Sequence, residues 1–186
     1  MLKKTTILAL LFLLAGTISF AQGKYFTKNG KIEFFSKADL EDIQAENKTV
    51  TVVMDSRSGT VAFSVLMKGF EFEKKLMQEH FNDTYVESGK YPKGEFKGTI
   101  TNNTAINYSK DGSYPATIKG KLTIHGVTKD IQATGTVKVE GGKIRTSAVF
   151  NILLSDYNIQ VPAAVKKKLS NTIRVTVDCL LEPLKK

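Results

Sequence analysis

The side chains best suited to chemistry in this sequence are two histidines and one cysteine, and they are widely separated. His80, His125 and Cys179 have no further histidine or cysteine close by, so their spacing does not predict a metal site. His125 follows an alternating segment on its polar face, beside a turn. A hydrogen bond that fixes this turn is a better interpretation than catalysis. Cys179, the single cysteine, forms no intramolecular disulfide and is expected to be a small buried side chain.

The motifs of the common catalytic classes are missing from the sequence. It contains no Gly-x-Ser-x-Gly, His-Glu-x-x-His, Cys-x-x-Cys or phosphate-binding loop, and no serine has a recognisable base and orienting acid. Asp156 and Tyr157 are expected to hold a turn. We therefore predict no catalytic residue, no metal and no cofactor, and we interpret the protein as a binding protein rather than an enzyme.

The elements that would position a binding site are strands, and the clearest of them lie in Thr117–Leu154. Polar and apolar residues alternate from Thr117 to His125, and the alternation resumes at Ile131. A period of two is typical of antiparallel strands with one buried face. Gly141-Gly142 indicates a hairpin turn before a third run, because both central turn residues need positive φ.

Five further segments complete a set of eight predicted strands, with two short helices between them. Phe72–Phe81 has apolar residues at helical spacing, and Pro162 suits the first turn of a second helix. Ala38–Asn47 is predicted to be a loop or a helical turn, and Asp55–Gly59 a hairpin turn. The five strands are Lys31–Ser36, entered through an Asn29-Gly30 turn, Thr49–Met54, Thr60–Met67, Glu95–Asn102 and Asn171–Leu181.

Eight mostly antiparallel strands either close into a barrel or split into a sandwich, and the pattern alone leaves both open. An eight-stranded barrel is about the smallest that encloses one ligand. Glycines within strands favour strong bending. Small inward residues are expected to leave space inside, and they are Gly98, Gly120, Ala133, Gly135 and Ala148.

Residues 1–21 are predicted to be a secretory signal peptide, and residues 22–186 to be one domain. Lys3-Lys4 precede the apolar run Ile7–Leu14, and Ser19-Phe20-Ala21 offers small residues for cleavage after Ala21. The apolar run is well short of the roughly 20 residues of a transmembrane helix. The expected location is therefore periplasmic or secreted.

The net charge of +9 includes Lys3 and Lys4, so the mature chain carries 9 − 2 = +7. A basic balance favours anionic partners such as a membrane surface, although a merely soluble basic surface is equally consistent with it. Aromatic residues are not interleaved with arginines, so nucleic acid is not a predicted partner. Transient membrane contact and a homodimer stay open.

Several segments, in order along the chain, resemble the YceI-like family. The most specific lies in Pro115–Asp130, where Leu122–Lys129 (LTIHGVTK) is similar to the family's signature hairpin. Leu154–Pro162 (LSDYNIQVP) is similar to its Asp-aromatic-Gly-Ile segment, with Asn158 in the glycine position. Further resemblance lies in Tyr91-Pro92-Lys93 with Phe96, and in Ile173–Leu181.

The resemblance implies an all-β fold, an eight-stranded antiparallel lipocalin-like barrel, usually exported to the periplasm. The barrel of such proteins holds a long apolar chain, in some members an isoprenoid such as a polyprenyl quinone or polyprenyl phosphate. Ala38–Asn47 lacks the histidine that many members carry after the first strand. The identity of the ligand therefore does not follow from the resemblance.

If the strands close into a barrel, their apolar faces line a lumen for an acyl or prenyl chain. Burial releases roughly 0.8 kcal/mol per methylene, so such a lumen needs no special chemistry. The predicted ligand-binding residues are Val52, Met54, Phe63, Val65, Met67, Phe96, Ile100, Leu122, Ile124, Ala148, Phe150 and Ile152, with Phe70, Phe72, Met77 and Phe81 at the mouth.

The predicted function is an exported lipid-binding protein that holds an isoprenoid or fatty acyl derivative non-covalently, with a lysine or arginine meeting an anionic head. The alternative is a structural or stress-related interaction module whose barrel is filled and binds no ligand. An enzyme would need two or more titratable groups in the lumen, and the alternation puts almost none there. The volume and polarity of the cavity distinguish these hypotheses.

Overall fold

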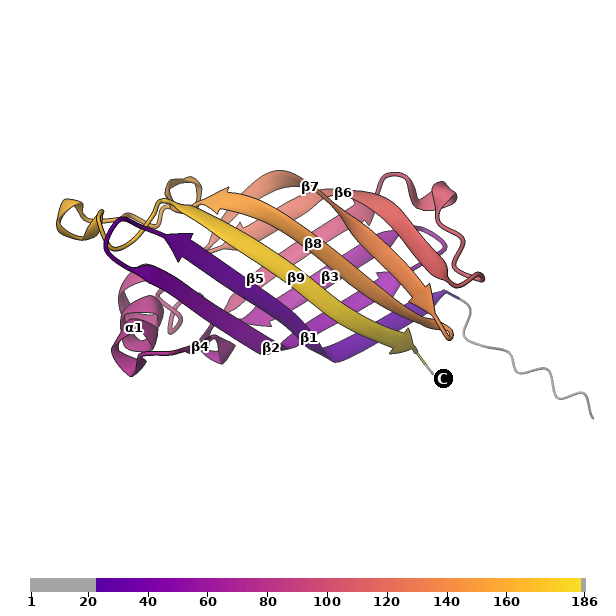
Figure 1. The fold of residues 1–186 in the computed structure, drawn as a ribbon, viewed down its shortest axis with the longest axis horizontal. Coiled ribbons are helices and arrows are strands. Elements are labelled where there is room, and N and C mark those ends of the chain that lie inside the picture. The colour runs from indigo at the N-terminus through magenta and orange to yellow at the C-terminus, as the bar shows by residue number, and fades with distance from the viewer. Residues whose placement is uncertain (1–22, 185–186) are drawn as a thin grey trace, which may run out of the picture.

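The computed structural model describes residues 23–184, whose strands form a closed antiparallel barrel (Figure 1). Eight strands follow in the order β1-β9-β8-β7-β6-β5-β3-β2, and β2 pairs with β1 to close the ring. β4 is a short addition beside β2. The lipocalin-like barrel is therefore confirmed. The strands are β1 (Lys24–Lys37), β2 (Asp42–Asp55), β3 (Thr60–Leu66), β4 (Glu71–Phe72), β5 (Lys93–Ile100), β6 (Gly112–Ile124), β7 (Val127–Glu140), β8 (Lys143–Leu153) and β9 (Thr172–Pro183).

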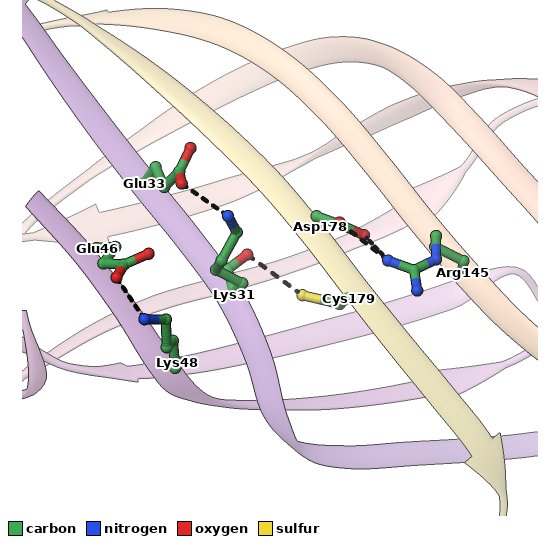
Figure 2. Close-up of polar contacts among 7 residues, drawn as sticks. All are labelled: Lys31, Glu33, Glu46, Lys48, Arg145, Asp178 and Cys179. Atoms are coloured by element: carbon green, nitrogen blue, oxygen red, sulfur yellow. Dashed lines mark hydrogen bonds and ion pairs between the residues drawn. The ribbon is translucent and has the colours of Figure 1, made fainter.

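The alternating apolar side chains point into the barrel, as predicted. Ile144 of β8 and Leu181 of β9 are register partners and have no exposed surface. The outer face is polar, and Arg145 Nη1 lies 2.7 Å from Asp178 Oδ1 across these two strands (Figure 2). Such exposed ion pairs contribute little to stability. They distinguish the outer face of the wall from the inner one.

The first two strands are longer than predicted. β1 begins at Lys24, so Asn29-Gly30 is not an entry turn but lies within the strand at an irregularity of the register with β2. A Cβ atom at Gly30 would lie 2.7 Å from Cys179 Sγ, so glycine is needed there for close approach. Ala38–Asn47 is not a loop or helical turn throughout, since β2 begins at Asp42.

The helical prediction is correct for the first segment and wrong for the second. α1 (Lys75–His80) begins three residues after Phe72, and Phe81–Tyr85 continues it as a π-helical turn. After Pro162 the chain forms only a 3₁₀ turn, Ala163–Val165, because so short a segment gives too few hydrogen bonds to nucleate a helix. Further 3₁₀ turns lie at Met67–Gly69, Asn103–Ala105 and Leu154–Tyr157.

Two hairpin turns have the structure that the sequence predicts. Gly141 and Gly142 have φ values of 57° and 77°, as the turn between β7 and β8 requires. Asp55–Gly59 joins β2 to β3, where the Gly59 amide donates to the Asp55 carbonyl at 2.8 Å. Both hairpin predictions are confirmed.

Two clusters of buried side chains lie toward the two ends of the barrel. Figure 1 shows one end with α1, β4 and the 155–171 segment, which we call the α1 end, and the C-terminal end of β9 opposite it. Phe70, Tyr157 and Ile159 belong to the cluster at the α1 end. The cluster of the opposite end contains Val52, Met54, Ile144, Cys179 and Leu181 among its members.

Candidate functional site

The candidate site is an internal cavity of about 360 Å³ in the barrel. Its wall is formed by inward side chains from both halves of the barrel, such as Phe63 of β3, Phe96 of β5 and Phe150 of β8. Nearly all of these side chains are apolar. A space with such walls binds apolar groups by removing them from water and offers little to a polar substrate.

Most of the predicted ligand-binding residues lie in the wall of this cavity. Val52 and Met54 do not line it, and both have no exposed surface and pack in the cluster of the opposite end. Alternation identifies the inward face of a strand but carries no information on depth along the barrel axis. The predicted residues that line the cavity are Phe63, Val65, Met67, Phe70, Phe72, Met77, Phe81, Phe96, Ile100, Leu122, Ile124, Ala148, Phe150 and Ile152.

Only part of the predicted set of small inward residues lines the cavity. Ala133, Gly135 and Ala148 do so, and Gly135 and Ala148 are register partners across β7 and β8. Gly98 and Gly120 face each other across β5 and β6, and the Phe96 ring covers them. A Cβ atom at Gly98 would lie 2.4 Å from Phe96 Cζ, so these two glycines accommodate a ring rather than a ligand.

An aromatic cluster borders the cavity at the α1 end. The Phe34 ring lies 5.3 Å from Phe70 and 5.4 Å from Phe81, measured between ring centroids. Phe72 completes the cluster, 5.1 Å from Phe81. Phe34 was not among the predicted residues. Its strand was predicted, but its meeting with three phenylalanines from a different segment depends on barrel closure.

The titratable side chains in the cavity wall are few, and most lie near the α1 end. Glu41, His80, Tyr85, Glu95 and Lys168 are those among the described residues. Lys74 Nζ donates to Glu41 Oε1 at 2.6 Å, and this hydrogen bond lowers the pKa of the Glu41 carboxyl. Lys168 places an ammonium group in this part of the wall.

Polar residues also lie in the wall away from the charged end, and Thr146 is the one with a buried hydroxyl. The Thr146 hydroxyl of β8 is buried and has no hydrogen-bond partner among the described residues. Its register partners are Val137 and Cys179, both buried. Thr136 and Ser147 also belong to the wall at this depth, and Thr146 carries its unpaired buried hydroxyl among the described residues.

His125 has the structural role that the sequence indicates. It lies in the turn between β6 and β7 with φ of 50°. Nδ1 lies 3.1 Å from the Tyr157 carbonyl oxygen, and Nε2 lies 2.6 Å from Glu87 Oε2. The Tyr91 ring packs against the imidazole at 4.6 Å between centroids. We call His125, Glu87, Tyr91 and Tyr157 the His125 clasp, because they join three separate loops.

Cys179 is buried beside β1. Its Sγ lies 3.8 Å from the Lys31 carbonyl oxygen (Figure 2), and burial raises the pKa of the thiol to about 12. Within residues 23–184, no three His, Cys, Asp or Glu side chains are grouped closely enough to hold a metal ion. In the same range, no helix has the length and apolar character to cross a membrane.

The fold and this cavity define a lipocalin-like barrel with an apolar interior. The model of the YceI-like domain matches residues 15–181 of the sequence. The protein belongs to the YceI-like family, as the LTIHGVTK segment indicates. The predicted signal peptide, residues 1–21, lies outside the described residues.

Solved structures share the fold at low sequence identity. A polyisoprenoid binding domain from Saccharophagus degradans, implicated in plant cell wall breakdown, has a TM-score of 0.76 at 12% identity, covering 88% of this chain and 99% of that one. Burkholderia cenocepacia BcnA has a TM-score of 0.65 at 14% identity, covering 82% of this chain and 95% of that one. The Campylobacter jejuni YceI protein has a TM-score of 0.54 at 20% identity, covering 81% of this chain and 86% of that one. Comparison with curated proteins gave no match.

Proposed function

We propose that this protein is an exported binding protein that holds a long-chain amphipathic lipid, an isoprenoid or a fatty acyl derivative, non-covalently in its barrel. The observation that carries the proposal is the cavity of about 360 Å³ with almost entirely apolar walls. Its volume lies in the range of roughly 300–1,000 Å³ that is usual for ligand pockets. Membership of the YceI-like family and the fold shared with a polyisoprenoid binding domain support it.

The binding mechanism is desolvation of the apolar chain, without catalysis. Each methylene moved from water into the cavity contributes roughly 0.8 kcal/mol. The polar head stays at the α1 end, where Lys168 offers an ammonium group to a phosphate or carboxylate. The head thereby keeps contact with water while the chain loses it.

Export and encounter with a membrane belong to the same proposal. The sequence of residues 1–21 has the features of a signal peptide, which would deliver the barrel to the periplasm or outside the cell. Lys166, Lys167 and Lys168 follow one another in the 155–171 segment at the α1 end. They favour transient contact with an anionic membrane surface, the expected source of the lipid.

Organic extraction of the mature protein, purified from its own host, tests the proposal by mass spectrometry. A stoichiometric long-chain lipid in the extract is the expected result. The matched control is Ala148→Phe, which places a ring in the cavity and should reduce the recovered lipid. Recovery of no lipid from the unmodified protein, and no binding of added isoprenoid or fatty acid, would favour a filled interaction module instead.

A further inference from the structure

The strand pairing between β7 and β8 is incomplete. These strands pair from Glu140 and Lys143 up to Gly135 and Ala148, and the ladder ends there. Beyond that point β7 continues to Val127, paired with β6, and β8 continues to Leu153, paired with β9. We call the region between 127–134 and 149–153 the β7–β8 gap.

The β7–β8 gap opens on the cavity. Ile131 and Ala133 line the cavity from one edge of the gap, and Phe150 and Ile152 line it from the other. On the outside of the β8 edge, Val149 is 56% exposed and Leu153 is 41% exposed. Apolar side chains therefore lie inside and outside the same stretch of unpaired wall.

The gap is bounded at both ends by specific contacts. At one end of the gap, the hydrogen-bonded β7–β8 ladder begins at Gly135 and Ala148. At the other end, beside the β6–β7 turn, the His125 clasp joins this turn to the 3₁₀ turn after β8. The contact runs from His125 Nδ1 to the Tyr157 carbonyl oxygen. Tyr157 and Ile159 are buried beneath this contact.

We propose that the β7–β8 gap is the route by which the apolar chain of the ligand enters and leaves the cavity, and that the His125 clasp limits its opening. The inference rests on the proposed function. Separating fully paired strands such as β6 and β7 breaks ladder hydrogen bonds, whereas the two edges of the gap share none.

The α1 end is a poorer route for the chain. The aromatic cluster of Phe34, Phe70, Phe72 and Phe81 borders the cavity there. The Leu40 amide also donates to the Lys167 carbonyl at 2.8 Å, which joins the connection before β2 to the 155–171 segment. A chain leaving through the gap passes over Val149 and Leu153, which shield it from water in transit.

A tether across the gap tests the route. Gln132 and Asn151 are exposed and would be register partners if the ladder continued, so Gln132→Cys with Asn151→Cys accepts a short bis-maleimide linker. The matched control is Thr99→Cys with Lys119→Cys, register partners across the paired β5–β6 seam. Buried Cys179 is left in place, and the unmodified protein shows whether it reacts.

The measurement is exchange of a fluorescent fatty acid between the protein and phosphatidylcholine vesicles. The linker across the gap should slow uptake and release by roughly tenfold or more with little change in Kd, and the control linker should change neither rate. Equal rates with and without the linker across the gap would overturn the route. Absence of uptake by the unmodified protein would overturn the proposed function, and the route with it.

A second variant tests the clasp without a linker. Glu87→Gln removes the carboxylate 2.6 Å from His125 Nε2 and leaves the side chain nearly the same size. Release of the fatty acid should become several-fold faster. Glu140→Gln, which removes a carboxylate 2.8 Å from Lys138 Nζ outside both the clasp and the cavity wall, is the control, and equal acceleration by both substitutions would overturn the role of the clasp.

Discussion

Replacement of Ala148 by phenylalanine is expected to abolish most lipid binding while leaving the barrel folded. Ala148 lies on the inner face of β8, opposite Gly135, and lines the cavity. Its methyl group faces a partner without a side chain. The added ring therefore extends into the cavity rather than into the wall.

The magnitude follows from the volume of the cavity. About 360 Å³ accommodates about a dozen groups of water size, at roughly 30 Å³ each. Methylenes are of similar size, so a chain that fills the cavity gains about 10 kcal/mol at roughly 0.8 kcal/mol each. The benzyl group adds six carbon atoms and takes about half of these positions, which removes about 5 kcal/mol. At 1.4 kcal/mol per tenfold, Kd should rise by roughly three orders of magnitude.

Titration of delipidated protein with a fluorescent fatty acid measures this change. Leu180→Phe is the matched control, because Leu180 of β9 is 40% exposed and does not line the cavity. Circular dichroism establishes that both variants keep the strand content of the parent. A folded Ala148→Phe variant that binds within tenfold of the parent would refute the location of the ligand.

Three further predictions concern single side chains. Thr146→Val removes a buried unpaired hydroxyl, and the free energy of unfolding of the ligand-free protein, from urea denaturation, should rise by about 1 kcal/mol. Burial raises the pKa of Cys179 to about 12, so a thiol reagent at pH 8 should label it only after denaturant is added. Gly98→Ala places a methyl group 2.4 Å from Phe96 Cζ and 2.5 Å from the Lys119 carbonyl oxygen, and should lower the free energy of unfolding by about 2 kcal/mol.

Each of these predictions has a result that contradicts it. Thr146→Val should not destabilise, since it exchanges an unpaired hydroxyl for a methyl group of similar shape. The pKa of the Cys179 thiol is higher in the folded protein than in the unfolded one. The stability that the protonated thiol contributes is therefore fully present below about pH 9, and it is lost as the pH rises toward 12. Labelling of the native thiol at pH 8 would contradict its burial. Gly89→Ala is the control for Gly98→Ala, because no atom lies within 4 Å of its Cβ position.

The strands that the sequence predicts well are those with uninterrupted alternation. β6, β7 and β8 alternate over most of their length, and their turns contain glycines at positive φ. The beginning of β2 was missed because Asn47, with no exposed surface, interrupts the apolar face. Its Nδ2 donates to the Leu66 carbonyl at 2.9 Å, and its Oδ1 accepts from the Thr49 amide. A buried polar residue satisfied by backbone looks like a loop residue in a sequence.

The candidate site was predictable in its chemistry but not in its position. An apolar face on every strand requires an apolar interior, whichever residues surround the space. Whether a given side chain faces the cavity or another side chain depends on its height in the barrel, and Val52 and Met54 pack against other side chains in the cluster of the end opposite α1. The contact of Phe34 with Phe81 depends on closure of β1 against β2 and on the path of α1.

The incomplete seam between β7 and β8 also bears on stability. Unpaired strand edges invite pairing with other chains, and a closed barrel normally removes them. Here each edge is covered in part, since Tyr157 and Ile159 pack beside the end at the His125 clasp and exposed Gln132 and Asn151 put polar side chains along the gap. A bound chain behind Ile131 and Phe150 would support the same wall from inside. Loss of ligand should therefore loosen these two edges before any other part of the barrel, and hydrogen exchange of 127–134 and 149–153 should increase first on delipidation.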